Sequence, residues 1–149
     1  MPGDGNCLFY CLAFFLYKDL NLAVQVRHST VNFVAKYWHK YRSFLLDSNG
    51  EEYANEYEYV KKASLNSYYA SEIEIQASAE KFKLFIVIKK DGQTLVFGDP
   101  NHRKIYVAHK YSFDNGHFDL LIPNNEASSV SLPKNDVPTM EQRVTEVKV

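Results

Sequence analysis

Apolar residues are most concentrated near the start of the chain, in a run from Cys7 to Tyr17 that contains no charged residue. Four of them recur at helical spacing and would face a core: Leu8, Leu12, Phe15 and Leu16. The run is about half as long as the ~20 residues that a membrane-spanning helix needs. No basic region precedes it, as a secretory signal would require. We therefore predict a buried helix over residues 7–18 of a soluble protein.

Helical spacing returns over residues 23–45 and again over residues 71–81. In the first stretch, one apolar stripe has basic residues opposite to it: Val24, Val31, Val34, Trp38 and Tyr41. In the second stretch, Ser71 stands at the N-cap position and Glu74 completes a capping box. Between them, the composition predicts a turn at 47–50 and a weakly helical segment rich in acids and tyrosines.

The pattern then changes to that of β-strands. Residues 82–88 read FKLFIVI, a run of β-branched and aromatic residues that is typical of a buried strand. An Asp-Gly pair at 91–92 predicts a hairpin turn before a strand at 94–97. Further strands are expected at 105–108 and 117–122. Because helices come first and strands last, we predict an α+β fold with a small, mainly antiparallel sheet flanked by helices.

The chain of 149 residues is the size of one domain. From Pro123 onward the composition becomes rich in Pro, Ser and Asn, which is typical of a linker or tail. The final segment is too short for a stable isolated helix. We predict one folded domain over residues 1–122 and a linker or C-terminal tail over residues 123–149.

Charge and cysteine usage narrow the classes of partner. The chain carries 17 basic and 18 acidic residues, so its formal net charge is −1. This balance gives no electrostatic reason to expect a nucleic acid or a membrane as partner. We also expect the protein to be a monomer. The two cysteines, Cys7 and Cys11, are spaced too widely on a helix for an unstrained disulfide, and no zinc-ligand spacing occurs. We expect no metal, no cofactor and a reducing cytoplasmic compartment.

Cys7 stands at the predicted start of the first helix, directly after a turn that contains Gly3 and Gly5. The N–H groups and the positive dipole end of a helix N-terminus favour a thiolate over a thiol. The same N–H groups can donate to a tetrahedral oxyanion, since glycines let the turn approach a reacting carbonyl. We therefore expect Cys7 to be an exposed nucleophile at the first position of a buried helix.

A cysteine nucleophile needs a base, and the base needs a group that orients it. Both side-chain types occur together far along the chain, at His117 and Asp119. On a strand these two side chains point to one face, whereas Phe118 and Leu120 point to the other. Asp119 could accept from the imidazole and leave its other nitrogen toward Cys7. Each motif alone is common in structural roles, but the combination is typical of a thiol hydrolase.

The segments around these residues resemble motifs of the ovarian tumour (OTU) family of deubiquitinating cysteine proteases. Residues 4–9, DGNCLF, resemble the family's cysteine loop, and residues 116–119, GHFD, resemble its histidine motif. Residues 69–77, YASEIEIQA, are similar to a family helix that opens with Trp-Gly-Gly. The stretch around Arg27 resembles a Leu-Arg-containing helix of the family. The resemblance spans roughly residues 2–122 in the expected order.

This resemblance implies a papain-like OTU fold and a Cys-His-Asp triad. Cys7 would be the nucleophile, His117 the general base and then acid, and Asp119 the group that orients the imidazole. The implied reaction is hydrolysis of the isopeptide bond between the C-terminal glycine of ubiquitin and a lysine. The implied partner is ubiquitin or polyubiquitin, and the implied place of action is the cytosol, that of a host if the source is viral or bacterial.

Other residues have implied or hypothetical roles around the triad. The resemblance implies that backbone N–H groups of one loop form the oxyanion hole: Asp4, Gly5 and Asn6. We hypothesise that four residues contact substrate: Glu51, Glu52, Asn115 and Gly116. The glutamates are chosen because the ubiquitin tail is basic, although an acidic run is more often a solvated surface. Asn115 is also a second candidate for orienting the imidazole.

Two other functions remain open at this point. The chain could bind ubiquitin without turnover, although the presence of Cys7, His117 and Asp119 argues against a silent domain. It could also be a thiol protease for a ubiquitin-like modifier. If the chain binds ubiquitin and does not cleave it, the silent binding domain is the correct function and not the active enzyme.

Overall fold

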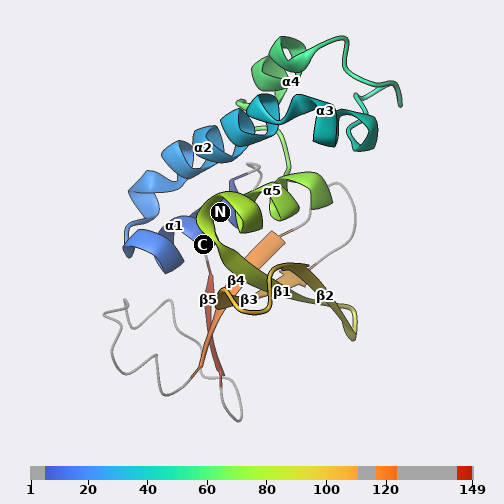
Figure 1. Ribbon diagram of the computed structural model, residues 1–149. Coiled ribbons are helices and arrows are strands. Elements are labelled where there is room, and N and C mark those ends of the chain that lie inside the picture. Colours follow the sequence, from blue (N-terminus) through green and yellow to red (C-terminus); the bar gives the residue numbers. More distant parts are fainter. Residues whose placement is uncertain (1–5, 111–116, 124–143, 149) are drawn as a thin grey trace.

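The computed structural model of the chain describes residues 6–110, 117–123 and 144–148. Figure 1 shows the helices gathered on one side of a five-stranded sheet. The helical elements are α1 (Cys7–Tyr17), η1 (Leu20–Leu22), α2 (Ala23–Lys36), α3 (Trp38–Tyr41), η2 (Arg42–Phe44), α4 (Glu56–Ala63) and α5 (Glu72–Phe82). The strands are β1 (Leu84–Lys90), β2 (Gln93–Gly98), β3 (Arg103–Lys110), β4 (His117–Pro123) and β5 (Val144–Lys148). The predicted α+β class is confirmed.

The first helix lies between the sheet and α2. It packs on β4 on one side and on α2 on another, which covers the apolar run on most of its surface. The helix ends at Lys18, which adopts a left-handed conformation with φ 58° and donates its N–H to the carbonyl of Phe14. The predicted helix over residues 7–18 is therefore confirmed to within one residue.

The predicted helix over residues 23–45 is wrong in its length. Regular helix stops at Lys36, and Tyr37, with φ −109° and ψ 41°, separates α2 from the single turn of α3. The predicted apolar stripe is also partly wrong, because Val24 is 42% exposed while Val26 and Arg27 are buried. The face of α2 that packs on α1 and α5 therefore carries an arginine. The sequence analysis had expected basic residues only on the opposite, exposed face.

Side-chain caps define the next two helices. Asn55 caps α4 by accepting the N–H of Glu58 at 3.0 Å, and Ser71 caps α5 with its predicted capping box to Glu74. The box includes the N–H of Ser71 donating to the Glu74 carboxylate at 2.6 Å. The predicted turn at 47–50 is present, closed by the Gly50 N–H on the carbonyl of Asp47 at 3.0 Å.

The sheet has the strand order β2-β1-β3-β4-β5. Three neighbouring pairs are antiparallel and only β1 and β3 run parallel, so the prediction of a mainly antiparallel sheet is confirmed. The predicted Asp-Gly hairpin joins β1 to β2, with positive φ at both Asp91 (49°) and Gly92 (78°). Phe82 belongs to the end of α5 rather than to the strand, because the chain reverses at Lys83 with φ 54°.

Strand β5 lies in the segment that the sequence analysis assigned to a linker or tail. Its register pairs Asp119 with Lys148 and Leu120 with Val147. The sequence analysis judged the final segment only as a helix, although its residues 144–148, VTEVK, include three β-branched residues. The division of the chain at residues 122 and 123 stays a prediction.

The described core consists of two clusters. One lies between the sheet and the helices α1 and α5, and it includes Leu8, Phe9, Cys11, Ile86, Ile105, Phe118 and Leu120. The other lies where α2, α4 and α5 meet, and it includes Val31, Val34, Tyr41, Tyr59, Ala63 and Ala77. The outer helices are therefore attached to the sheet through α1 and α5, as Figure 1 shows.

We expect substitution of Gly98 to be far more destabilising than substitution of Gly92. Both have positive φ, but a Cβ at Gly98 would lie 2.2 Å from the carbonyl oxygen of Leu84, whereas nothing lies within 4 Å at Gly92. Gly92→Ala should cost about 1 kcal/mol from backbone strain alone, and Gly98→Ala about 3 kcal/mol or more. Urea unfolding of both variants measures this difference, and equal losses would contradict it.

Candidate active site

Cys7 is the first residue of α1, as predicted. The residue before it, Asn6, occupies the N-cap position, and its carbonyl accepts the N–H of Tyr10 at 2.8 Å, which begins the helix. The expectation that Cys7 is exposed is wrong, because its side chain is only 3% exposed. It belongs to the same apolar cluster as Cys11 and Ile75, so the helix start is packed into the core.

A buried arginine adjoins the helix start. Arg27 of α2 is fully buried, and its Nε donates to Oδ1 of Asn6 at 2.8 Å. Its Nη1 donates to the carbonyl of Ala63 at the end of α4, at 2.9 Å. The guanidinium also lies over the ring of Phe9, 4.6 Å from the centroid. One side chain thus connects α2, α4 and the first turn of α1.

The cysteine helix is joined directly to the strand that carries the histidine motif. Cys11, one turn after Cys7, donates its thiol to the carbonyl of Phe118 at a sulfur–oxygen distance of 3.6 Å. Phe118 lies between His117 and Asp119 in β4. The structure therefore brings together two segments that are more than one hundred residues apart in sequence.

The backbones of His117 and Asp119 are placed by strand pairing. His117 begins β4 and pairs with Lys110, and Asp119 pairs with Ala108. Phe118 and Leu120 are buried, as the predicted alternation requires. The side chains of His117 and Asp119 lie outside the described residues, as do Asp4, Gly5, Asn115 and Gly116.

The acidic candidates Glu51 and Glu52 lie in the loop before α4. Both are exposed, and Glu52 is 3.8 Å from the guanidinium of Arg42. The loop runs beside α4, because its residues Asp47 and Tyr53 line one cavity with Lys61 and Lys62 near the end of that helix.

Comparison of the sequence with known protein families shows to which family the chain belongs. The family described as OTU-like cysteine protease matches residues 2–118 of the chain. The chain belongs to that family. The predicted family is confirmed, and the match includes both the cysteine loop and the start of the histidine motif.

A curated relative of this OTU chain is the ubiquitin thioesterase otu2 of Schizosaccharomyces pombe (strain 972 / ATCC 24843). It is 31% identical over 101 residues, which cover 65% of the OTU chain and 34% of the relative. The chain therefore spans about a third of the length of this relative.

Solved structures share the fold at low sequence identity. The OTU domain of OTUD1 matches with a TM-score of 0.65 and 20% identity, over 80% of each chain. The viral OTU domain protease of Qalyub virus matches with a TM-score of 0.59 and 22% identity, over 78% of this chain and 77% of that one. An OTU deubiquitinase from Wolbachia pipientis wMel, bound to ubiquitin, matches with a TM-score of 0.55 and 18% identity, over 78% and 88%. The predicted OTU fold is confirmed by these likenesses.

The OTU chain also contains a buried carboxylate with four hydrogen-bond donors. Glu74 is fully buried and accepts from the hydroxyls of Tyr59 at 2.6 Å and Tyr68 at 3.0 Å. It also accepts from the N–H and the hydroxyl of Ser71, both at 2.6 Å. Burial, reinforced by this carboxylate, raises the pKa of both phenols well above the usual value, and Arg27 opposes the rise at Tyr68.

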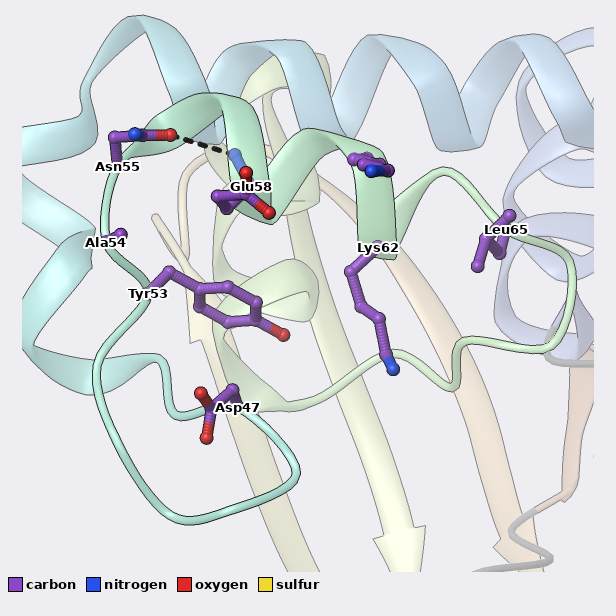
Figure 2. Close-up of a pocket in the computed structure, with 8 residues that line it drawn as sticks. Asp47, Tyr53, Ala54, Asn55, Glu58, Lys62 and Leu65 are labelled. Carbon is purple, nitrogen blue, oxygen red and sulfur yellow. Dashed lines mark hydrogen bonds between the residues drawn. The ribbon is translucent and has the colours of Figure 1, made fainter.

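Two cavities lie near the elements described so far. One of about 210 Å³ is bounded by the start of α5 and the sheet, and its lining includes Ser71, Ile75, His109 and Phe118. It therefore adjoins the strand of the histidine motif. The other, of about 510 Å³, lies beside α4, and Figure 2 shows Tyr53 and Lys62 extending into it from different sides.

Two features of the described part of the chain concern metal ligands and membrane-spanning helices. There, no three His, Cys, Asp or Glu side chains gather closely enough to hold a metal ion. No described helix has the length and apolar character to cross a bilayer.

Sequence reasoning missed the roles of Arg27 and of Glu74 beyond its capping box. For Arg27 a signal was available, because it stands four residues from both Ala23 and Val31, which are buried on the same helix. A charged residue in register with apolar ones indicates a buried partner. For Glu74, no pattern could have indicated that tyrosines from α4 and the next loop would donate to it.

The stability of the OTU chain should fall as pH rises above about 10, the usual pKa of tyrosine. Unfolded tyrosines lose their protons there, whereas the raised pKa of Tyr59 and Tyr68 keeps these two protonated in the folded chain. Each should contribute up to about 1.4 kcal/mol of lost stability per pH unit. Tyr59→Phe should be less stable at pH 7 by about 1–2 kcal/mol, yet lose stability less steeply above pH 10.

Urea unfolding between pH 7 and 11.5 measures these slopes. Tyr57→Phe is the matched control, because Tyr57 lies on the same helix and is 75% exposed, and it should keep the wild-type pH dependence. The interpretation would be contradicted if Tyr59→Phe had the wild-type slope above pH 10.

Proposed function

We propose that this chain is a deubiquitinating cysteine protease that hydrolyses the isopeptide bond after the C-terminal glycine of ubiquitin. The observation that carries the proposal is the hydrogen bond from Cys11 to the carbonyl of Phe118, which joins the helix of Cys7 to the strand of His117 and Asp119. Family membership supports the thiol chemistry. The names of the relatives, a ubiquitin thioesterase and a deubiquitinase bound to ubiquitin, support the substrate class.

The proposed reaction has two steps. The Cys7 thiolate attacks the carbonyl of the terminal glycine, and backbone N–H groups at the start of α1 and in the preceding loop stabilise the oxyanion. His117 gives a proton to the departing lysine amine, while Asp119 holds the imidazole in orientation. His117 then takes a proton from water, which attacks the thioester, releases ubiquitin and restores the thiolate.

A second candidate function is binding of ubiquitin without turnover. The observation that favours it is the burial of Cys7, since a nucleophile with 3% exposure must be uncovered before a substrate carbonyl reaches it. The helix start and the retained Cys, His and Asp residues favour the enzyme. The two functions differ in whether a covalent adduct forms at Cys7.

We expect an electrophile-tipped ubiquitin to add to the chain at Cys7. The wild-type protein should gain the mass of one ubiquitin, and Cys7→Ala should gain nothing, because the adduct requires the thiolate. His117→Ala should react at least ~100-fold more slowly at pH 7, since the base supplies a factor of that order. Intact mass spectrometry measures all three. A folded wild-type protein that binds ubiquitin and forms no adduct would support the binding domain instead.

We further propose that Glu51 and Glu52 contact a basic surface of ubiquitin. Because they are exposed and lie outside the helices that carry Cys7 and Arg27, their reversal to lysine should raise KM and leave kcat unchanged. Neutralisation to glutamine should give a smaller rise, and 0.5 M salt should reduce both effects. Steady-state kinetics on a ubiquitin substrate measures this, and an unchanged KM in the double reversal would dismiss the contact.

A further inference from the structure

The start of α1 differs from the starts of two other described α-helices, α4 and α5, in its N-cap. Asn55 at the N-cap of α4 and Ser71 at the N-cap of α5 each accept an N–H of their own first turn. Asn6 occupies the same position before α1, yet its side chain accepts no N–H of that helix. Asparagine is among the best N-cap residues, so the absence of this bond needs a physical cause.

Two features of the structure account for the missing bond. The Asn6 backbone has φ −91° and ψ 1°, whereas the capping residues Asn55 and Ser71 are extended, and the Arg27 guanidinium holds the Asn6 side chain. The Nε of Arg27 donates to Oδ1 of Asn6 at 2.8 Å, and Oδ1 is the atom with which a capping asparagine accepts the second or third N–H of a helix. Asn6 is 2% exposed and Arg27 is fully buried, so solvent does not compete for this bond. The buried arginine therefore draws the cap oxygen away from the first turn.

The displaced cap lies directly beside the candidate nucleophile. Cys7 is the residue after Asn6, and the N–H groups that a cap would occupy are those of Leu8 and Phe9. A cap oxygen carries partial negative charge and would compete with a thiolate or an oxyanion for these donors. With the oxygen held by Arg27, the first turn can direct its N–H groups at negative charge on Cys7.

Two further contacts fix the guanidinium in place. Its Nη1 donates to the carbonyl of Ala63, and its plane lies over the ring of Phe9, 4.6 Å from the centroid. The Ala63 bond holds the arginine from the α4 side, and the Phe9 contact holds it from the first turn of α1. The planar fork of arginine makes the Asn6 and Ala63 bonds together, which a lysine ammonium on a flexible stem cannot reproduce.

We propose that Arg27 is a positioning residue that lowers the pKa of the Cys7 thiol by keeping the Asn6 side chain off the N-terminal N–H groups of α1. This inference rests on the proposed function only in that Cys7 is the reactive thiol. Arg27 does not touch the substrate in this proposal. It acts through Asn6, and its removal releases the cap oxygen to its ordinary place on the helix.

The test is the pH dependence of Cys7 alkylation by iodoacetamide in the full chain, read by fragmentation mass spectrometry that separates Cys7 from Cys11. Arg27→Met should raise the midpoint by about one pH unit, which is a tenfold loss of rate below the midpoint. The double variant Asn6→Ala/Arg27→Met, which has no cap oxygen, should return most of the way to the wild-type midpoint. A merely structural or purely electrostatic role of Arg27 predicts no such return.

Matched controls separate this effect from general destabilisation. Thr30→Val removes a fully buried hydroxyl of α2 that lies 3.1 Å from the Ser78 hydroxyl, and it should lower stability without moving the midpoint. Arg103→Met removes an arginine that lies over Phe15 at the other end of α1, 4.4 Å from the ring centroid, and it should also keep the midpoint. If Arg27→Met does not fold, Arg27→Lys replaces it, with a smaller rise expected.

The outcomes of these experiments are distinct. A wild-type midpoint in the folded Arg27 variant overturns the inference, and so does a double variant that keeps the raised midpoint. In a ubiquitin cleavage assay at pH 7, Arg27→Met should lower kcat about tenfold with little change in KM. If the wild-type chain cleaves no ubiquitin but its Cys7 midpoint still depends on Arg27 and Asn6 in this way, the proposed function fails and this inference stands.

Discussion

A helix that is apolar on almost every side must be covered on every side, and this constraint on α1 organises the rest of the structure. The sheet covers one side through β4, and α2 covers another. Because α2 is needed there, α5 and α4 attach to it and form the outer helical tier in Figure 1. The residue that performs the proposed chemistry stands at the first position of this helix, so the described part of its surroundings is set by core packing.

Burial of this kind leaves polar groups that must find partners inside the protein, because an unsatisfied buried donor or charge costs several kcal/mol. Arg27 and Glu74 are two such buried groups, one a hydrogen-bond donor and the other an acceptor, and both have partners. The arginine donates to Asn6 and Ala63, and the glutamate accepts from two phenols and from Ser71. Tyr68 is close enough to respond to both charges, so the two polar clusters are electrostatically connected. Substitutions in one cluster should therefore not be assumed independent of the other.

Much of this arrangement could be predicted from the sequence. Three features depend mainly on residues that are close in sequence, so a local pattern can predict them: the position of α1, the capping box at Ser71 and the hairpin at residues 91–92. The family could also be predicted, because the motifs that carry the resemblance, DGNCLF and GHFD, are short and contiguous. The break at Tyr37 was missed because apolar spacing continues through it. Strand β5 was missed because a five-residue segment after a Pro-rich stretch becomes a strand only through its pairing with β4, and that pairing cannot be seen in a local pattern.

The contact between Cys11 and Phe118 closes a loop of 107 residues. Contacts of such long range form late, because the entropy of closing the loop is lost before the contact contributes anything. During synthesis at ~5–20 residues per second, roughly 5–20 s pass between the emergence of the cysteine helix and that of its partner strand. The nascent chain therefore carries the cysteine for seconds before a site can exist around it. The order of the elements along the chain delays this contact until β4 has been synthesised.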